Sequence, residues 1–233
     1  MEVQFGAAKA AKYAVQESGD TLEVIERPHG GMSAVLVDGQ RSGQSARIIS
    51  NIVARKAISL VGEGVRDGAA ARAAHDYLRT HRGGQVSAEL QILSVDLETK
   101  SVVLSRNTRC PALLYRDGQL EVLDTPGQPI GVYTYTKPII AEWPLQAGSY
   151  VVIFTDGLQH AGQRSGIGFD FVATIAEILG RGWSAQEIAD VILDRALEAD
   201  QYRPGDDISV LVLAVLPVQV PHGVHRFCVS LAV

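Results

Sequence analysis

The residues of this sequence that could take part in chemistry are aspartates that stand at the ends of apolar runs. Asp38 and Asp156 each end an apolar run and are each followed by glycine, whereas Asp206–Asp207 stands just before the apolar run 208–213. A carboxylate at the mouth of a buried strand is poorly solvated and needs a hydrogen-bond donor or a cation. Three such strand ends meeting in one fold would form an oxygen-ligand cage for hard divalent metal ions. The pattern therefore predicts a metal site.

Each of these signals also has an ordinary structural interpretation. Asp-Gly is common at strand ends, where glycine supplies the positive φ angle of a turn. Asp206–Asp207 follows Arg203-Pro-Gly and could be an acidic turn, although two adjacent carboxylates repel each other and a cation would relieve that repulsion. The segment 17–20, Glu-Ser-Gly-Asp, could likewise be a hairpin turn. Only the joint occurrence of these carboxylates at strand ends favours a metal site.

The elements that must position these aspartates are predicted by changes of hydrophobic period along the chain. Alternating runs separated by glycine-rich turns predict strands, and apolar residues at helical spacing predict helices. The predicted strands cover residues 3–13, 21–26, 32–37, 86–96, 101–106, 112–115, 120–123, 138–143, 150–155 and 208–216. The predicted helices begin at Ser42-Gly-Gln-Ser, cover 70–78 and 170–179, and begin again at the capping box Ser184-Ala-Gln-Glu187.

The order of these elements predicts one α+β domain over residues 1–216. Strands, two helices, strands, two helices and a final strand favour antiparallel sheets packed between helical layers. The short turns between residues 86 and 155 predict an antiparallel meander. The segment 217–233 is predicted to be a C-terminal tail or an extra edge strand.

The composition indicates a globular protein and argues against a nucleic-acid-binding or membrane-spanning one. The 233 residues are 46% hydrophobic and 20% charged, which is typical of a globular protein with a sizeable core. A formal net charge of −5 without a Lys/Arg-rich run excludes a basic nucleic-acid footprint. No apolar segment approaches the ~20 residues that span a bilayer, the N-terminus lacks a signal-peptide pattern, and the cysteines have no metal-type spacing. We therefore expect a cytoplasmic protein with no membrane and no nucleic-acid partner.

Four segments resemble, in type and order, the metal-dependent protein phosphatases of the PPM (protein phosphatase 2C, PP2C) class. They are Ser18-Gly-Asp20, Val35-Leu-Val-Asp38-Gly39 with Ser42-Gly43 after it, Phe154-Thr-Asp156-Gly157, and Asp206-Asp207-Ile-Ser-Val-Leu-Val-Leu213. The chain is most similar to the bacterial SpoIIE-like branch and, within it, to compact stressosome-feedback phosphatases of the RsbX type. The segments 106–118 and 129–131 also fit the central hairpin of the family, so the resemblance covers roughly residues 15–216.

The resemblance implies a four-layer α-β-β-α sandwich of two antiparallel sheets flanked by helix pairs. It also implies two Mn²⁺ or Mg²⁺ ions at one end of that sandwich. Carried over to this chain, Asp38 would bridge the two ions and the carbonyl of Gly39 would bind one of them. Asp156 and Asp206 would hold the other ion.

Two further aspartates belong to the implied metal site. Asp20 would bind a metal directly or through water, and Asp207 would take a supporting place beside the ligands, where many relatives carry Asn. Two metals about 3.5–4 Å apart lower the pKa of a bridging water and hold phosphoryl oxygens for in-line attack. The resemblance thus implies hydrolysis of a phosphate monoester by metal-activated water, without a covalent phospho-enzyme.

Three residues depart from the family pattern. Gln40 stands where eukaryotic relatives carry a His proposed as the general acid, and Arg41 stands where bacterial relatives usually carry Gly. The Arg41 guanidinium could contact the substrate phosphate, because it favours bidentate anions, or it could be exposed on a turn. His160 lies four residues after Asp156 and could be a proton donor near neutral pH or a solvated loop histidine.

The leading functional hypothesis is a serine/threonine protein phosphatase that acts on a phosphorylated bacterial signalling protein. By resemblance, this partner would be a STAS-domain stressosome or anti-sigma-antagonist protein. The alternative is a catalytically silent module that binds a phosphoprotein with the same fold. A phosphatase for a small phosphorylated metabolite is a third possibility, because the sequence defines no substrate pocket.

Overall fold

Two antiparallel sheets of five strands each form the centre of the molecule. In spatial order, the first sheet contains β1 (Glu2–Ala10), β10 (Ile208–Leu216), β9 (Ser149–Phe154), β6 (Ala112–Arg116) and β7 (Gln119–Leu123). The second contains β2 (Thr21–Glu26), β3 (Gly31–Gly39), β4 (Ala88–Asp96), β5 (Ser101–Asn107) and β8 (Ile139–Pro144). The structure, a computed structural model, describes residues 1–217. The predicted tail, 217–233, therefore lies outside the described residues except for Pro217.

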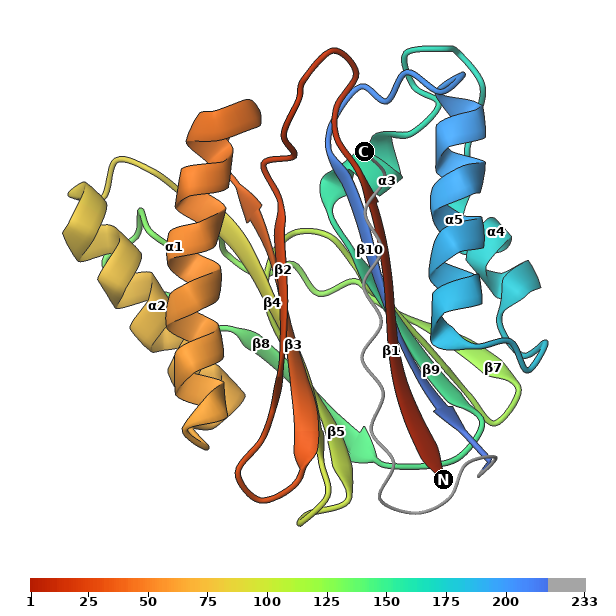
Figure 1. Cartoon of the computed structure of the whole chain (residues 1–233), viewed down its shortest axis with the longest axis horizontal. Helices are drawn as coiled ribbons and strands as arrows, with labels where there is room; N and C mark the ends of the chain where they lie inside the picture. The colour runs from red at the N-terminus through yellow and green to blue at the C-terminus, as the bar shows by residue number, and fades with distance from the viewer. Residues whose placement is uncertain (218–233) are drawn as a thin grey trace.

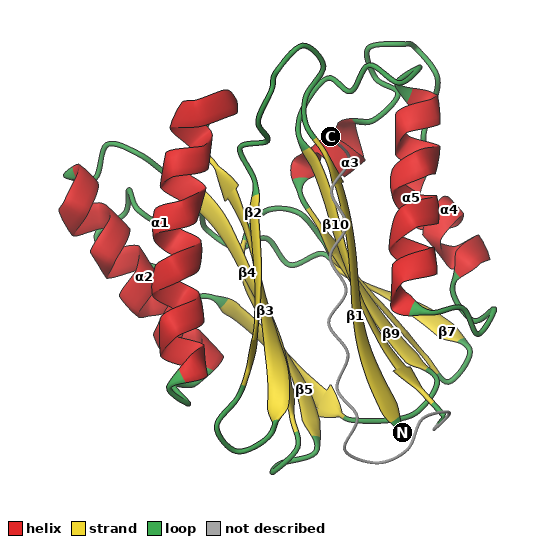
Figure 2. Cartoon of the chain, in the orientation of Figure 1, coloured by secondary structure: helices red, strands yellow, loops and turns green. Residues whose placement is uncertain are grey.

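Helices cover the outer face of both sheets. The helices α1 (Gly43–Gly62) and α2 (Asp67–Arg82) pack on the second sheet, and α4 (Phe171–Ile178) and α5 (Ala185–Ala199) lie beside the first (Figure 1). A short helix, α3 (Asp156–His160), directly follows β9. Figure 2 shows the two layers of strands between two outer layers of helices. The predicted four-layer α-β-β-α sandwich is confirmed.

The apolar pattern of the sequence accounts for three core layers. In α1, Ile49, Val53, Ala57 and Val61 recur at helical spacing and are all buried against the second sheet. A second layer lies between the first sheet and the helices α4 and α5, and a third lies between the two sheets. All nine residues of β10 are buried, because this strand lies between β1 and β9 and is covered on both faces. Such a strand reads as a continuous apolar run rather than an alternating one.

Most element boundaries agree with the predicted ones, but the predicted meander is wrong, because the chain changes sheet three times within it. After β5 it leaves the second sheet to form β6 and β7 in the first, returns to the second as β8, and crosses again to the first as β9. Strand spacing alone cannot show these crossovers; β6, for example, buries residues on both faces and fits either sheet. The helix α3 was not predicted. No helix in the described part of the chain is both long and apolar enough to cross a bilayer.

Candidate metal centre

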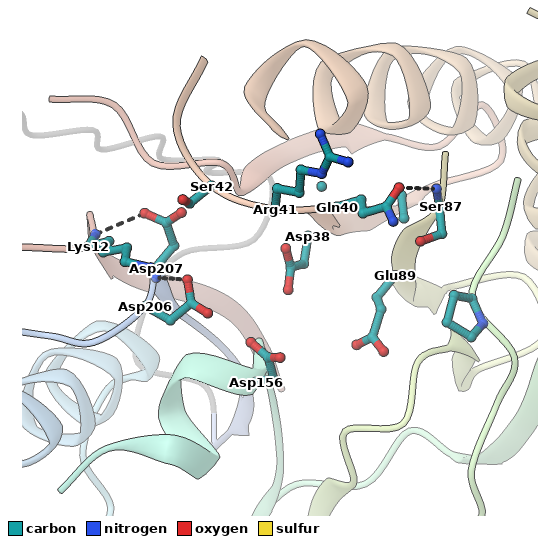
Figure 3. A pocket seen from close by; sticks show the side chains of 13 residues that line it. Lys12, Asp38, Gln40, Arg41, Ser42, Ser87, Glu89, Asp156, Asp206 and Asp207 are labelled. Atoms are coloured by element: carbon teal, nitrogen blue, oxygen red, sulfur yellow. Dashed lines mark hydrogen bonds between the residues drawn. The ribbon is translucent and has the colours of Figure 1, made fainter. Parts of the chain in front are cut away.

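A hollow of about 330 Å³ opens where strand ends from both sheets meet. Asp38 comes from the end of β3 in one sheet, whereas Asp156 follows β9 and Asp206 precedes β10 in the other. Their carboxylates line the same hollow (Figure 3). The complete lining is Lys12, Asp38, Gly39, Gln40, Arg41, Ser42, Ser87, Ala88, Glu89, Pro129, Asp156, Asp206 and Asp207. The predicted site residues are therefore brought together, with the exceptions of Asp20 and His160.

The glycine that follows each strand-end aspartate is required by close packing. A Cβ at Gly39 would lie 2.1 Å from the carbonyl oxygen of Ala46 in α1, and one at Gly157 would lie 2.1 Å from the carbonyl oxygen of Asp207. Neither glycine has a positive φ angle, so the interpretation of these Asp-Gly pairs as positive-φ turns is wrong. Each glycine instead lets a second backbone approach beside the aspartate, which holds the carboxylate at the rim of the hollow.

Asp20 is the most deeply buried of the predicted ligands, with 1% of its surface exposed. Its Oδ2 accepts hydrogen bonds from the hydroxyls of Thr155 (3.0 Å) and Ser209 (2.6 Å). Its Oδ1 is buried and has no hydrogen-bond partner. Burial raises the pKa of this carboxyl group to about 6, although the two hydroxyls act in the opposite direction. Asp20 therefore offers one unused oxygen behind the hollow.

Both carboxylate oxygens of Asp207 accept hydrogen bonds from backbone N–H groups. Its Oδ1 accepts from the N–H of Lys12 and its Oδ2 from the N–H of Gly19, each at 2.9 Å. The Asp207 N–H in turn donates to Oδ1 of Asp206 at 3.0 Å. The Asp207 carboxylate thus ties the loop between β1 and β2 to the start of β10, next to Asp206, which lines the hollow.

Burial and mutual repulsion raise the pKa of the carboxyl groups around the hollow. The pKa of Asp38 is raised to about 10, first by burial and then by the charges of Asp20, Asp156, Glu89 and Asp206. Burial also raises the pKa of Asp156, and the charge of Asp206 is the next cause. These carboxylates cannot all ionise at neutral pH unless positive charge is added.

The donor set suits a hard divalent cation. Carboxylates and a backbone carbonyl are the oxygen ligands that Mg²⁺ and Mn²⁺ prefer. The buried Oδ1 of Asp20 has no hydrogen-bond partner, and a cation, or a water bound to a cation, would supply one. Within residues 1–217, no three His, Cys, Asp or Glu side chains converge closely enough to grip one ion on their own, so the carboxylates surround the hollow rather than meet in it. The residues present fit Mn²⁺ or Mg²⁺ ions that also keep water ligands.

Glu89 is a pocket carboxylate that the sequence analysis missed. It lies directly opposite Asp38 in the pairing of β3 with β4 and lines the hollow. The Thr108 hydroxyl donates a short hydrogen bond to its Oε2, and the N–H of Arg109 donates to its Oε1 at 3.3 Å. Like charges directly opposite each other on paired strands are unfavourable, which is a further reason for a cation here. Only the strand register reveals this pair, so no sequence signal could have found it.

Gln40 and Arg41 occupy the rim of the hollow beside Asp38. The side-chain oxygen of Gln40 accepts a hydrogen bond from the backbone N–H of Ser87 (3.1 Å), and the backbone N–H of Gln40 donates to the Ser87 carbonyl (3.2 Å). Gln40 therefore closes the end of the β3–β4 ladder. Arg41 has a φ of +77°, a conformation that favours glycine. In Figure 3 its guanidinium points away from the Asp38 carboxylate.

His160 faces a separate, smaller hollow. Its Nδ1 lies 4.0 Å from Oδ2 of Asp156, one helical turn away on α3. Together with Arg164 and Asp200 it lines a hollow of about 120 Å³, which adjoins the larger one through Asp206. The structure thus places His160 behind Asp156 rather than among the residues that line the larger hollow.

Comparisons with known proteins find one family for nearly the whole described chain. The family model described as Stage II sporulation protein E (SpoIIE) matches residues 28–216. The stage II sporulation protein E of Bacillus subtilis (strain 168) is 22% identical over 213 residues, which cover 91% of this chain and 26% of that protein. The protein of the same name from Priestia megaterium is 21% identical over 212 residues, which cover 90% of this chain and 36% of that protein. The chain thus spans about a quarter to a third of the length of these curated relatives.

Solved structures share the fold. The PP2C phosphatase domain of Bacillus subtilis SpoIIE, with a fragment of its regulatory domain, matches with a TM-score of 0.79 and 21% identity, covering 92% of this chain and 64% of that one. The catalytic domain of the serine/threonine protein phosphatase PstP with two manganese ions gives 0.69 and 17% (92% and 99% covered), and RsbX with magnesium gives 0.70 and 15% (91% and 94%). A structure from the bacterial stressosome gives 0.69 and 20% (91% and 100%). At these identities, the structures establish the shared two-sheet fold.

Proposed function

The chain belongs to the SpoIIE family, and from this premise we propose that it is a metal-dependent serine/threonine protein phosphatase of the PP2C type. The observation that carries the proposal is the ring of carboxylates from Asp38, Asp156 and Asp206 around one hollow. The raised pKa values of Asp38 and Asp156 support a role in binding cations, because the protein surrounds these carboxylates with further negative charge. We propose Mn²⁺ or Mg²⁺ as the cofactor, with two ions bound.

The family resemblance and the shared hollow support an assignment of ligands. Asp38 would lie between the two ions and the carbonyl of Gly39 would bind one of them, while Asp156 and Asp206 would hold the other. When bound, such ions supply positive charge for the phosphoryl oxygens and a water of lowered pKa. Asp38 lines the same hollow and would then accept a hydrogen bond from this water.

Two other aspartates would support the ligands in different ways. Asp20 would use Oδ1 toward an ion, directly or through water, because the hydroxyls of Thr155 and Ser209 already occupy Oδ2. Asp207 would act as a positioning residue, because both its oxygens accept backbone N–H groups. The Arg41 guanidinium points away from Asp38 and His160 lines the smaller hollow, so we assign neither of them a catalytic role.

We propose a phosphorylated bacterial signalling protein, of the STAS-domain type, as the substrate. The fold shared with RsbX and with the stressosome structure supports this choice. The wide, solvent-open hollow also suits a phosphorylated side chain on a protein surface better than it suits enclosure of a small metabolite. The predicted cytoplasmic location remains a prediction.

The experiment is phosphate release from para-nitrophenyl phosphate and from a phosphorylated STAS-domain protein, with and without Mn²⁺. We expect Mn²⁺-dependent hydrolysis that Asp38→Asn abolishes and chelation prevents. Asp190→Asn, an acid-to-amide change on the exposed face of α5, is the matched control and should keep full activity. Hydrolysis that survives in Asp38→Asn or in the presence of chelator would contradict the proposal.

The alternative of a catalytically silent phosphoprotein-binding module is favoured by one observation. The Gln40 side chain is hydrogen-bonded to the backbone of Ser87, and an amide cannot act as a general acid beside Asp38. A phosphorylated STAS-domain protein that binds but stays phosphorylated in the presence of Mn²⁺ would establish this alternative.

A further inference from the structure

One face of the molecule combines exposed aromatic and aliphatic side chains with basic residues. We call it the basic–aromatic face. It consists of Arg72, Arg79 and Arg82 of α2 together with Val132, Tyr133, Tyr135 and Lys137 from the segment that leads into β8, and Ile140 of β8 itself. Tyr135 is 87% exposed, Tyr133 44% and Val132 42%, although large apolar groups usually lose such exposure on folding. The proposed phosphatase chemistry uses none of these residues.

Close approaches at two glycines show that the segment runs along α2. A Cβ at Gly84, just after α2, would lie 3.6 Å from the carbonyl oxygen of Val132 and 4.0 Å from Cγ of Arg79. A Cβ at Gly68, near the start of α2, would lie 2.7 Å from Cδ1 of Ile140. The same position is 3.7 Å from Nη1 of Arg72. The arginines and the exposed apolar side chains therefore share one surface along the length of the helix.

This face is attached to the wall of the acidic hollow. The N–H of Gly131 donates to Nδ1 of the buried His75 in α2 at 3.0 Å. The preceding Ile130 exchanges two backbone hydrogen bonds with Ala88, at 2.9 and 3.1 Å. Ala88 and Pro129 both line the hollow. A polypeptide whose phosphorylated side chain entered the hollow would therefore reach the basic–aromatic face within a few residues.

The basic residues of this face have no acidic partner within the described part of the chain. Arg72, Arg79, Arg82 and Lys137 form no ion pair and no side-chain hydrogen bond there, and the Nε atoms of Arg79 and Arg82 are buried without a partner. The protein as a whole carries a net charge of −5 and its hollow is lined by carboxylates. The four basic side chains outnumber Asp76, the exposed acidic residue of α2, and guanidinium groups bind carboxylates in bidentate fashion.

We propose that the basic–aromatic face docks an acidic segment of the phosphoprotein substrate, next to its phosphorylated residue. The inference rests on the proposed function, because it places the docked segment beside the phosphate-binding hollow. Arginines would pair with Glu and Asp side chains, and the tyrosines would supply rigid contact area at low entropic cost. A nucleic acid fits less well, since its phosphates would also meet the carboxylates around the hollow and the net negative charge.

The test compares two phosphothreonine peptides that differ only in flanking residues, three glutamates in one and three glutamines in the other. The wild-type protein with Mn²⁺ should show a kcat/KM about tenfold higher for the acidic peptide, as a few exposed charge pairs would provide. The double change Arg72→Glu with Lys137→Glu should remove this preference and leave hydrolysis of para-nitrophenyl phosphate unchanged. Tyr135→Ser should lower kcat/KM for both peptides without affecting para-nitrophenyl phosphate.

The matched control is Arg55→Glu with Lys100→Glu, an equal charge change at exposed positions on α1 and in the β4–β5 turn. It should keep the preference, and all variants should unfold at the wild-type temperature. Equal hydrolysis of both peptides by the wild-type protein, or loss of the preference in the control, would overturn the proposal.

Direct binding separates the docking proposal from the proposed activity. If the wild-type protein hydrolyses neither peptide, the phosphatase proposal fails, but fluorescence anisotropy with a labelled glutamate-rich peptide still decides the docking proposal. Binding that Arg72→Glu with Lys137→Glu abolishes would support it, and absence of binding would refute it. Tighter binding of a labelled single-stranded DNA that the same double change abolishes would assign the face to nucleic acid and overturn the proposal.

Discussion

A carboxylate stands near each end of strand β3, the buried Asp67 near its start and the half-buried Asp38 at its other end, and their surroundings differ. Near its start, the hydroxyls of Ser33 and Ser94 share a hydrogen bond of 2.6 Å. The guanidinium of Arg27 donates to the Ser33 hydroxyl and, at 3.0 Å, to Oδ1 of Asp67. At its other end, Asp38 forms no ion pair with a basic side chain of residues 1–217, and the neighbouring charges that shift its pKa are all carboxylates. Asp67 thus has a paired cation, whereas Asp38 has none among these residues.

The electrostatics of the two ends show what this difference means. Burial raises the pKa of Asp67, but the charge of Arg27 and the hydrogen bonds around it act to lower it. Around Asp38, by contrast, each neighbouring carboxylate raises the pKa further. A buried carboxylate with an internal cation is complete and serves the fold, whereas carboxylates that only repel each other require a cation from solution. This contrast is the physical reason for placing the functional site at the Asp38 end.

The same chemical change at the two ends should have very different effects on catalysis. We expect Asp156→Asn and Asp206→Asn each to lower Mn²⁺-dependent hydrolysis on the order of a thousandfold, because each removes a metal ligand worth several kcal/mol to the transition state. Asp67→Asn should keep activity within about threefold, because it acts only on stability. Initial rates with para-nitrophenyl phosphate measure all three. Comparable losses in all three variants would erase the distinction between the two ends.

Removing the internal cation should destabilise the fold without affecting the hollow. Arg27→Met leaves Asp67 buried without its partner and should lower the free energy of unfolding by about 3 kcal/mol, as for other broken buried pairs. The double change Arg27→Met with Asp67→Leu should recover most of this loss, because it removes both charges together. Urea unfolding measures both effects. An Arg27→Met protein as stable as the wild type would show that the pair is not what completes this end of the strand.

The pH dependence of stability should differ with and without metal. The folded pKa values of Asp20 (about 6) and Asp38 (about 10) lie above the ordinary aspartate value of 3.8, so the folded protein binds more protons than the unfolded chain between these values. Without metal, stability is therefore fully present below about pH 4 and is lost as pH rises, first through Asp20 and then up to about pH 10 through Asp38.

Between pH 6 and pH 8 in EDTA, we expect unfolding to become easier by about 1–3 kcal/mol. Saturating Mn²⁺ should reverse the trend, because the cation favours ionised carboxylates. Asp38→Asn should make the free energy of unfolding in EDTA less dependent on pH, because Asn does not titrate. Urea unfolding at the two pH values provides the comparison, and a metal-free wild type that gains stability from pH 6 to pH 8 would contradict the account.

Local patterns were enough to predict the elements and the strand-end aspartates. Asp38, Asp156 and Asp206 stand beside long apolar runs, so their place at strand ends followed from the sequence, whereas their grouping in one metal site was implied by the family resemblance. The capping box at Ser184 and Glu187 was likewise predicted and is present. These features depend on neighbours within a few residues, which the sequence displays directly.

Features that depend on register or on long-range packing could not be predicted. Glu89 faces Asp38 only because β3 pairs with β4 in one register. Gly39 looks like a turn residue until the backbone of Ala46 is seen 2.1 Å from its missing Cβ. The acceptor role of Asp207 toward Gly19 joins residues 188 positions apart. Tertiary structure, not local sequence, decides each of these.

Calorimetric titration of the metal-free protein with Mn²⁺ tests the central claim most directly. The account predicts binding in the micromolar to millimolar range for the wild type, loss of binding in Asp38→Asn, and unchanged binding in Asp67→Asn. No binding heat in the wild type, or equal binding in Asp38→Asn, would contradict the claim that the carboxylates at this end of β3 exist to hold divalent cations.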